Sequence, residues 1–393
     1  MGKKKRRDAA ANLEKEKLLD PERVKRKKKQ KKFQIILIVV LTIATVIMLA
    51  IIFYFVAGAM GKARLHSVDQ TIEPDRMVTE EPEELTEEEQ QIWQDGWIKY
   101  NGRIYAYNDD ILTFLFMGID KNDEVVQEVA EGTNGGQADA LFLLVLNPHT
   151  ESIDVIGINR NSMTDIDVYN EEGAYVNTIT AQIAVQHGFG NGVEESCEYQ
   201  VKAVRNLFYQ IPVHRYCAIN AKAVIPLTDM VGGVELTALE DVRRYGDKSG
   251  TILLQEGETQ LLDGELAYSY VRFRDTKQFG SADMRLQRQK QYLAEMMNRV
   301  KSRTAKDLLL PVKMYNELSS YMTTNVTADE VAYLSSVALN YHFDQSSIYS
   351  LEGETVQGEK FEEFYVDEDA LYEMIIDIFY EPVEENGGKN AQS

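Results

Sequence analysis

The longest apolar stretch of the chain lies near its N-terminus. Residues 33–60 contain no charged side chain. Their apolar run, Ile35–Ala57, exceeds the roughly 20 residues that a helix needs to cross the hydrocarbon of a membrane. A cleavable signal peptide usually has a shorter apolar region, although the small residues Gly58 and Ala59 are compatible with a cleavage site. The pattern therefore predicts one transmembrane helix over residues 33–60 rather than a cleaved signal.

Short apolar runs bounded by turn residues predict several buried strands. Ile111–Met117 is one such run. Ala140–Leu146 and Ser152–Ile158 flank the turn-rich tetrad Asn147-Pro148-His149-Thr150, and this arrangement predicts a hairpin. Further strands are expected at Arg215–Ile219, Val234–Ala238 and, because it alternates with a period of two, Tyr268–Arg274.

Other segments have apolar residues at helical spacing. Leu286, Leu293, Met297 and Val300 form one such stripe. Helices are expected at Ser196–Tyr209, Ala221–Val231, Met284–Val300 and Glu368–Tyr380. Because strands and helices are mixed along the chain, the sequence predicts an α/β fold, with a central mixed sheet covered by helices on both faces.

Charge is distributed unevenly along the chain. Residues 1–32 carry fifteen Lys or Arg and five Asp or Glu, a net charge of +10, whereas the whole chain has a net charge of −21. Basic residues beside a span remain in the cytoplasm. The clusters Lys3–Arg7 and Arg23–Lys32 therefore predict a cytoplasmic N-terminus that contacts anionic membrane lipid rather than nucleic acid. The larger part of the chain is then extracellular, on the outer face of a bacterial-type cell membrane.

Acidic residues dominate between the expected span and the expected domain. Residues 61–103 contain many Asp and Glu with little apolar periodicity, which predicts a self-repelling linker. Regular structure is expected to begin near Ile104. The predicted organisation is a basic cytoplasmic tail (1–32), a transmembrane helix (33–60), an acidic extracellular linker (61–103), an extracellular domain (104–383) and a disordered tail (384–393).

Two cysteines, Cys197 and Cys217, fall in the part expected outside the cell. A disulfide can persist there. The sequence is equally compatible with a disulfide and with two buried free thiols. Two cysteines without a neighbouring histidine pair are a weak metal signal.

Two carboxylates mark the ends of expected neighbouring strands. Asp120 follows the strand Ile111–Met117, and Asp139 opens the strand that contains Ala140–Leu146. If these strands pair, both carboxylates lie at one end of the sheet, where they suit Mg²⁺. The alternative is that each aspartate caps a turn.

Arginines occur in pairs near the end of the expected strand Tyr268–Arg274. Alternation would place Arg272 and Arg274 on one face of that strand. Two adjacent guanidinium groups repel each other unless an anion such as a phosphate lies between or above them. Ion pairs with Asp275 and Asp283 are the alternative.

More arginines follow in the next expected helix. Arg285, Arg288 and Gln289 stand at i, i+3 and i+4, so they share a surface near a helix N-terminus, where an anion can bind. A solvated polar face is the alternative. Arg160 directly follows an expected strand. Five arginines and two aspartates, without an evident His or Cys nucleophile, suit phosphoryl transfer.

The order of several short motifs resembles the LytR-CpsA-Psr family. The likeness covers about residues 110–300 and rests on Gly118-Ile119-Asp120, Gln137-Ala138-Asp139-Ala140, Asn159-Arg160-Asn161-Ser162, Gly232-Gly233-Val234, Leu262-Asp263-Gly264-Glu265, Tyr270-Val271-Arg272-Phe273-Arg274 and Arg285–Gln289. The resemblance implies a membrane-anchored phosphotransferase that uses Mg²⁺. It would move a glycopolymer-phosphate from a polyprenyl-pyrophosphate carrier, whose prenyl tail lies in an apolar pocket, to peptidoglycan.

The resemblance also implies roles for single residues. Asp120 and Asp139 would hold the metal. Catalysis and the grip on the pyrophosphate would fall to Arg160, Arg272, Arg274 and Arg285, and further substrate contacts to Arg288, Gln289 and Gln182.

Three positions depart from the family pattern. Gln137 stands where the family usually has Arg, Asn161 where it has Asp, and Thr178 where it tends to have Lys. Gln182 and His187 lie near the third departure. The departures favour one alternative to transfer, a non-catalytic polyprenyl-pyrophosphate-binding or regulatory protein at the cell surface. A lipid pyrophosphatase is a further alternative.

Overall fold

The structure is a computed structural model of the chain. It describes residues 56, 58–65, 85–94, 96–120, 135–170, 172–244, 250–275 and 277–383. The chain divides into two units, Met1–Ala57 and Gly58–Ser393, and the second unit is described below. The expected basic tail, the C-terminal tail and most of the expected span at 33–60 lie outside the described residues. Within the described ranges, no helix is long and apolar enough to cross a membrane.

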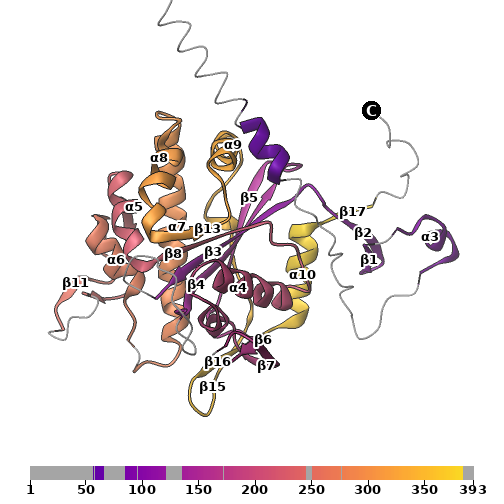
Figure 1. The fold of residues 1–393 in the computed structure, drawn as a ribbon, viewed down its shortest axis with the longest axis horizontal. Helices are drawn as coiled ribbons and strands as arrows, with labels where there is room; N and C mark the ends of the chain where they lie inside the picture. The colour runs from indigo at the N-terminus through magenta and orange to yellow at the C-terminus, as the bar shows by residue number, and fades with distance from the viewer. Residues whose placement is uncertain are drawn as a thin grey trace, which may run out of the picture. The chain divides into compact units, whose positions relative to one another are not determined.

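The centre of the second unit is a six-stranded mixed sheet with the order β13-β8-β3-β4-β5-β14 (Figure 1). β3 (Leu112–Ile119) and β4 (Ala138–Asn147) pair antiparallel, as do β4 and β5 (Ser152–Ile158), whereas β8 (Arg215–Asn220) pairs parallel with β3. The outer strands are β13 (Met322–Thr324) and β14 (Ile348–Ser350). The four expected strands of this sheet and the expected hairpin are confirmed.

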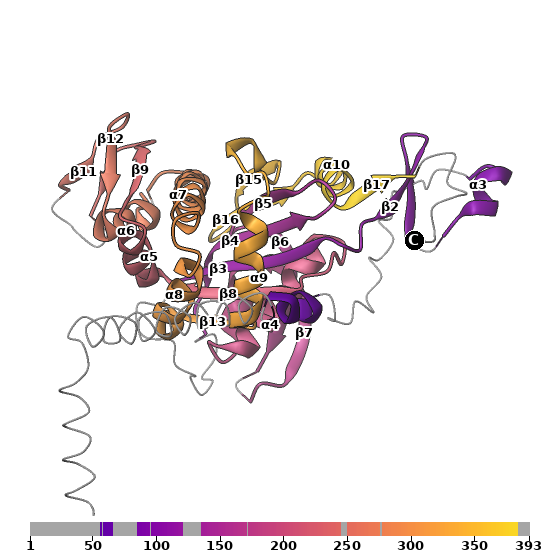
Figure 2. The ribbon, with the colours of Figure 1, turned by 90° about the horizontal axis from the view of Figure 1, so that it is seen from above.

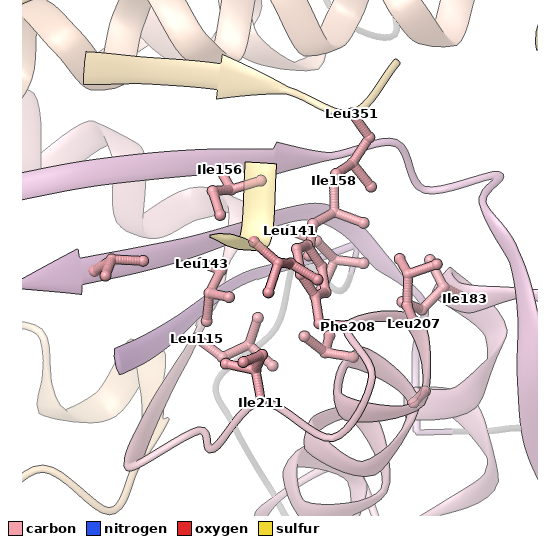
Figure 3. Packing of buried hydrophobic residues seen from close by; sticks show 14 of the residues in the cluster. Leu115, Leu141, Leu143, Ile156, Ile158, Ile183, Leu207, Phe208, Ile211 and Leu351 are labelled. Carbon is pink, nitrogen blue, oxygen red and sulfur yellow. The ribbon is translucent and has the colours of Figure 1, made fainter. Parts of the chain in front are cut away.

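Alternate residues of β3 face two different helical layers. Leu115 and Met117 belong to a core formed with α4 (Glu194–Leu207) and α10 (Glu368–Phe379). Figure 3 shows Leu115 beside Leu141 and Leu143 of β4, with Leu207 and Phe208 near them. Leu112 and Phe114 belong to a second core, formed with α7 (Ser281–Thr304) and α9 (Ala328–Ala338). The α/β class with helices on both faces of a mixed sheet is therefore confirmed.

A third core lies beside α7, on the side away from α10 (Figures 1 and 2). Its elements are η2 (Ala221–Ala223), α5 (Val224–Met230), β9 (Val234–Thr237), β10 (Val242–Arg243), β11 (Ile252–Leu254), β12 (Thr259–Leu262) and α6 (Gly264–Arg272). The expected helices and the expected strand at Val234–Ala238 are present, each within four residues of its expected ends. Tyr270 and Tyr292 carry much of this core, because both rings are at most 8% exposed.

The expected strand at Tyr268–Arg274 is wrong, because residues up to Arg272 form the helix α6. Asp263 begins this helix by accepting a hydrogen bond from the Leu266 amide at 2.9 Å. Ala267, Tyr270 and Val271 are buried, and their i, i+3, i+4 spacing is helical. The period of two in the polar residues is therefore accidental. Arg272 ends the helix and Arg274 follows it, so the two do not share a strand face.

Regular structure also begins before Ile104. α3 (Glu87–Ile92) has a capping box in which Thr86 and Glu89 satisfy each other's amide groups. β1 (Trp97–Tyr100) pairs with β2 (Arg103–Tyr107), and β2 pairs with β17 (Tyr380–Pro382) near the C-terminus. The two-residue turn Asn101-Gly102 has positive φ at both positions, +50° and +71°, as a type I′ hairpin requires.

The remaining elements surround the sheet. They are β6 (Met163–Tyr169), β7 (Tyr175–Gln182), η1 (Ile183–Phe189), α8 (Leu310–Glu317), η3 (Ser319–Tyr321), η4 (Gln345–Ser347), β15 (Gly353–Gln357) and β16 (Glu362–Val366). Cys197 in α4 and Cys217 in β8 are free thiols. Of the two possibilities left open by the sequence, the structure therefore has free thiols and not a disulfide.

Candidate functional site

Asp120 and Asp139 lie at the same end of the central sheet. Ile119 pairs with Ala138 after a shift in register, and Asp120 forms a backbone hydrogen bond of 3.1 Å to the Gln137 carbonyl. The side chain of Asp120 accepts a second bond from the Gln137 amide at 3.0 Å. The two strands are thus neighbours, as the hypothesis of paired carboxylates requires.

Three arginines from different elements converge on the Asp139 carboxylate. Arg160, from the loop after β5, forms an ion pair with Oδ1. Arg285, from the first turns of α7, places Nη1 3.2 Å from Oδ2. Arg272, at the end of α6, places Nη1 4.0 Å from Oδ2. All four side chains are at most 15% exposed, so the charges interact with little screening by solvent.

The cluster around Asp139 has an excess of positive charge, since three guanidinium groups surround one carboxylate. Burial lowers the pKa of Arg285 to about 10, which Asp139 opposes and the neighbouring arginines reinforce. Arg160 Nε and Arg285 Nη2 are buried and have no hydrogen-bond partner among the described residues. Buried donors in native proteins almost always have partners. The cluster therefore has both the charge and the spare donors to bind an anion.

Arg274 belongs to the same neighbourhood but has a different acid. Its Nη2 lies 3.2 Å from Oε2 of Glu362 in β16, and its Nε donates to the Ser281 hydroxyl at 3.0 Å. Glu362 Oε1 also accepts the Gly280 amide at 3.0 Å. Glu362 was not expected from the sequence, because it lies 88 residues after Arg274 and in no recognisable motif.

Arg288 lies apart from the Asp139 cluster. It is 1% exposed, forms an ion pair with Glu240, and donates to the carbonyl oxygens of Tyr270 and Phe273. Gln289 acts similarly by donating to the Val271 carbonyl at 3.3 Å. Both side chains therefore hold the C-terminal end of α6 and are not on a solvated polar face.

The three positions that depart from the family pattern have local partners. Gln137 accepts a hydrogen bond from Arg160. Asn161 accepts one from Gln182 Nε2 at 3.1 Å. Thr178 donates to Asp167 at 2.8 Å, on the β6–β7 hairpin. Arg160 thus lies beside Gln137, and Lys202 forms an ion pair with the same Asp167 that Thr178 contacts.

Gln182 and His187 connect the site to its surroundings. Gln182 Nε2 also donates to the Glu362 carbonyl at 2.6 Å, so it links the loop after β5 to β16. His187 is 1% exposed, and its Nδ1 lies 3.0 Å from the Gly136 carbonyl. His187 therefore supports the backbone beside Gln137 from within the core.

One apolar cavity adjoins the cluster, and a second, larger one shares a lining residue with the first. The smaller, of about 130 Å³, is lined by Asp139, Arg272 and Arg285 at one end and by apolar side chains such as Leu293 elsewhere. The larger, of about 360 Å³, lies between the sheet and α7, α8 and α9. Phe116 lines both cavities, so an apolar path leads away from the arginines.

The carboxylates at the sheet end have limited capacity for a metal. Within the described part of the chain, no group of three or more His, Cys, Asp or Glu side chains could hold an ion. Mg²⁺ is commonly held by one or two carboxylates together with substrate phosphates. Asp120 and Asp139 fit this pattern only once Asp139 exchanges an arginine partner for the ion.

Comparison with known proteins gives a consistent family. The LytR_cpsA_psr family model matches residues 73–376. A relative from Halalkalibacterium halodurans, named polyisoprenyl-teichoic acid–peptidoglycan teichoic acid transferase TagU, is 27% identical over 181 residues, which are 45% of this chain and 51% of the relative. A protein of the same name from Enterococcus faecalis is 25% identical over 65% of this chain and 72% of its own length. The chain thus spans about half the length of the first relative.

Solved structures share the fold. The crystal structure of B. subtilis TagV has a TM-score of 0.53 and 21% identity, and the match covers 68% of this chain and 95% of TagV. A structure of TagT bound to LI-WTA has a TM-score of 0.51 and 22% identity, over 68% of this chain and 89% of TagT. At these identities the likeness concerns the fold alone.

Proposed function

Because this chain belongs to the LytR_cpsA_psr family, we propose that it is a transferase that attaches a glycopolymer to peptidoglycan. The donor is a glycopolymer linked through a pyrophosphate to a polyprenyl lipid, and the protein moves the glycopolymer-phosphate to a peptidoglycan hydroxyl. The names of the relatives, which are teichoic acid transferases, support this reaction class. The chain's own site supports the donor class.

The observation that carries the proposal is the arginine cluster at the edge of an apolar cavity. Arg160, Arg272 and Arg285 outnumber their shared acid, Asp139. A pyrophosphate would take up the excess charge and the spare donors of Arg160 and Arg285. Arginine suits this task, because its planar fork binds phosphate oxygens in pairs. An anion with a long apolar tail would fit this site, because the anion would bind the arginines and the tail would lie in the cavity.

The two cavities would hold the prenyl tail. The smaller one begins at Arg272 and Arg285 and the larger one continues beyond Phe116. Both linings are almost wholly apolar, so burial of the lipid would gain about 25 cal/mol for each Å² removed from water. The arginines would then hold the pyrophosphate at the entrance of the smaller cavity, and the bound tail would fix the orientation of the pyrophosphate.

The proposal includes Mg²⁺ at Asp120 and Asp139. When bound, the ion would neutralise charge that develops on the phosphate oxygens. The residues fit if the pyrophosphate takes over the arginines of Asp139, since this leaves the Asp139 carboxylate free for the ion. Asp120 would be the second protein ligand, and its bond from the Gln137 amide would orient it.

We also propose a membrane location. The apolar segment 33–60 and the basic residues before it favour one span with a cytoplasmic N-terminus. The site would then be extracellular, near both the carrier lipid and peptidoglycan. Such an anchor would keep the domain close to its membrane-bound donor.

A second candidate is a polyprenyl-pyrophosphate-binding protein without catalysis. It is favoured by Gln137, Asn161 and Thr178, which are uncharged side chains where the family usually has charged residues. The arginine cluster would serve binding in either case. Turnover therefore separates the two functions.

The test uses the full chain in lipid nanodiscs with a labelled oligosaccharide on polyprenyl pyrophosphate. Peptidoglycan fragments and Mg²⁺ are added, and labelled peptidoglycan and released prenyl phosphate are followed. Transfer predicts labelled peptidoglycan, a lipid pyrophosphatase predicts free labelled sugar phosphate, and a binding protein predicts neither product.

A matched pair of variants tests the site. Arg272→Ala should weaken binding by about 1.5–3 kcal/mol, or roughly tenfold to over a hundredfold, since one charge-assisted bond is lost. Arg272→Lys should recover only part of this loss. Arg299→Ala, on the same helical layer but bonded to the Val231 carbonyl, is the control. Equal binding by Arg272→Ala and the parent would contradict the proposal.

A further inference from the structure

Glu362 is held at the side of the arginine cluster by three elements. Its carboxylate contacts Arg274 at 3.2 Å and the Gly280 amide at 3.0 Å. Its carbonyl accepts from Gln182 at 2.6 Å. Next to it, the Phe364 amide donates to the Asn161 carbonyl at 3.0 Å. The start of β16 is therefore tied both to the loop after β5 and to the segment between α6 and α7.

The other carboxylates near the site have other partners or another proposed role. Asp139 is bound by arginines at Oδ1 and Oδ2. Asp283 accepts from Asn159 at Oδ1 and from the Thr355 hydroxyl at Oδ2. Asp120 and Asp139 are the metal ligands of the proposed function, and the partners of Asp283 are neutral groups that a phosphate does not attract. Glu362, by comparison, has its Oε2 bound to the Arg274 guanidinium, which a phosphate can attract away.

We propose that Glu362 is the base that accepts the proton of the attacking peptidoglycan hydroxyl. This inference rests on the proposed transferase function. The pyrophosphate draws Arg274 toward itself and frees Oε2 of Glu362, so the base becomes available only when the donor is bound. The Gly280 amide keeps the carboxylate in place throughout.

The reaction step balances as follows. The acceptor O–H transfers its proton to Glu362 while its oxygen forms a bond to the phosphorus of the glycopolymer phosphate. The bond from that phosphorus to the bridging oxygen breaks, and its electron pair leaves with the polyprenyl phosphate. The proton on Glu362 then passes to solvent.

The position of Asn161 explains why a carboxylate from β16 is needed. Asn161 Oδ1 and the Glu362 carbonyl share one donor, Gln182 Nε2, so the two residues border the same part of the site. The Asn161 amide cannot accept a proton at neutral pH. An aspartate side chain at position 161 would therefore lie in the part of the site where Glu362 is proposed to act.

The experiment measures transfer and donor binding by the full chain in nanodiscs. Glu362→Gln should lower kcat by about a hundredfold or more, the usual contribution of a general base. Its Kd for a prenyl pyrophosphate should stay equal or fall, because a neutral amide competes less for Arg274. Adding Asn161→Asp to Glu362→Gln should restore transfer at least in part. Such rescue would not follow if Glu362 only stabilised the fold.

Two controls accompany these variants. Glu363→Gln changes the next residue of β16, whose side chain accepts from the Tyr365 hydroxyl at 2.8 Å and points to the opposite face; it should transfer as the parent does. Asp283→Asn tests the competing carboxylate and should retain more transfer than Glu362→Gln.

Three results would overturn the inference. The first is a Glu362→Gln variant that transfers as fast as the parent, and the second is one whose loss of transfer is matched by an equal loss of donor binding. The third is an Asp283→Asn variant that loses more transfer than Glu362→Gln. If the parent itself transfers nothing, the proposed function fails and this inference falls with it, whereas an active parent isolates the role of Glu362.

Discussion

Arg288 Nε donates a hydrogen bond to the carbonyl oxygen of Tyr270 at 2.9 Å, which ties α7 to the last turn of α6. The same guanidinium also donates to the Phe273 carbonyl and lies 5.3 Å from the centre of the Phe273 ring. Carbonyl groups at a helix end lack partners within the helix. Arg288 therefore fixes the backbone of residues 270–273, which contains Arg272 and is directly followed by Arg274.

The first prediction concerns the stability that this contact provides. Arg288→Ala should lower the free energy of unfolding by about 3–5 kcal/mol, because it removes a buried cation and leaves Glu240 and two carbonyl groups without it. Urea unfolding followed by circular dichroism measures the change. Arg299→Ala, on the same helix but bonded only to the Val231 and Gly232 carbonyl groups at 3.3 and 3.5 Å, should cost about 1 kcal/mol. Equal losses would mean that the contacts of Arg288 contribute no more to stability than those of Arg299.

The second prediction concerns Asp139 as the shared acid of the arginines. Asp139→Asn should lower the melting temperature, since three buried guanidinium groups lose their counter-charge; the cost is on the order of 3 kcal/mol. Added inorganic pyrophosphate should raise the melting temperature of this variant more than that of the parent, because the anion replaces the carboxylate.

Asp120→Asn is the matched control for this experiment. Its amide keeps an oxygen for the Gln137 amide, so stability should change by less than about 1 kcal/mol, while any Mg²⁺ dependence of turnover should weaken. If pyrophosphate stabilises both variants and the parent equally, the arginines around Asp139 are not the anion site.

The third prediction uses Cys217 as a reporter of the larger cavity. Cys217 lines this cavity together with Tyr315 and Leu334, and burial raises the pKa of its thiol to about 12. In a Cys197→Ala background, a small uncharged thiosulfonate at alkaline pH should modify Cys217 slowly. A prenyl pyrophosphate should slow the reaction further, in proportion to the fraction of protein that has lipid bound.

Inorganic pyrophosphate is the control for the protection of Cys217. It can occupy the arginines but has no tail, so it should leave the rate of modification unchanged. Protection by pyrophosphate alone, or no protection by the lipid, would show that the tail does not enter the cavity. Mass spectrometry of the intact protein measures the rate in each case.

The fourth prediction concerns pH and the attachment of β17. His149 lies 2.9 Å from Asp110 and 2.7 Å from Glu381 in β17, and hydrogen bonds to these two carboxylates raise its pKa. A raised folded-state pKa stabilises the fold fully below the unfolded value of about 6.5, and the stabilisation is lost as pH rises through the folded value. Because the ring is 46% exposed, the contribution should be less than about 1 kcal/mol.

Urea unfolding at about pH 5.5 and about pH 8.5 measures this contribution. The parent should lose more stability between the two values than His149→Gln does. An identical pH dependence in the two proteins would show that His149 does not link β17 to the turn between β4 and β5.

Several parts of the fold could be predicted because their signals are local. The apolar runs of β3, β4 and β5 are short and closed by turn residues, and these strands form the centre of the sheet. α7 follows from the spacing of its apolar stripe. The hairpin β1–β2 also had a local signal, Asn101-Gly102 between two alternating segments, but the surrounding acidic residues led to the prediction of a linker.

The helix α6 shows where local patterns mislead. The sequence from Tyr268 to Arg274 fits a period of two when its tyrosines and arginines are compared. Burial decides otherwise, because Ala267, Tyr270 and Val271 pack in the third core. A segment this short is compatible with both periods, and the packing against α7 selects the helix.

From the residues alone one could predict the residue types of the site, the strands at whose ends Asp120 and Asp139 lie, and the motif order that places the chain in its family. Which charges meet depends on the folded chain. Asp139 pairs with arginines from the loop after β5, from α6 and from α7, and Arg274 pairs with Glu362 instead. Periodicity in the sequence reports only which side of its own helix or strand a residue faces. An ion pair between residues 88 positions apart depends instead on the path of the whole chain between them.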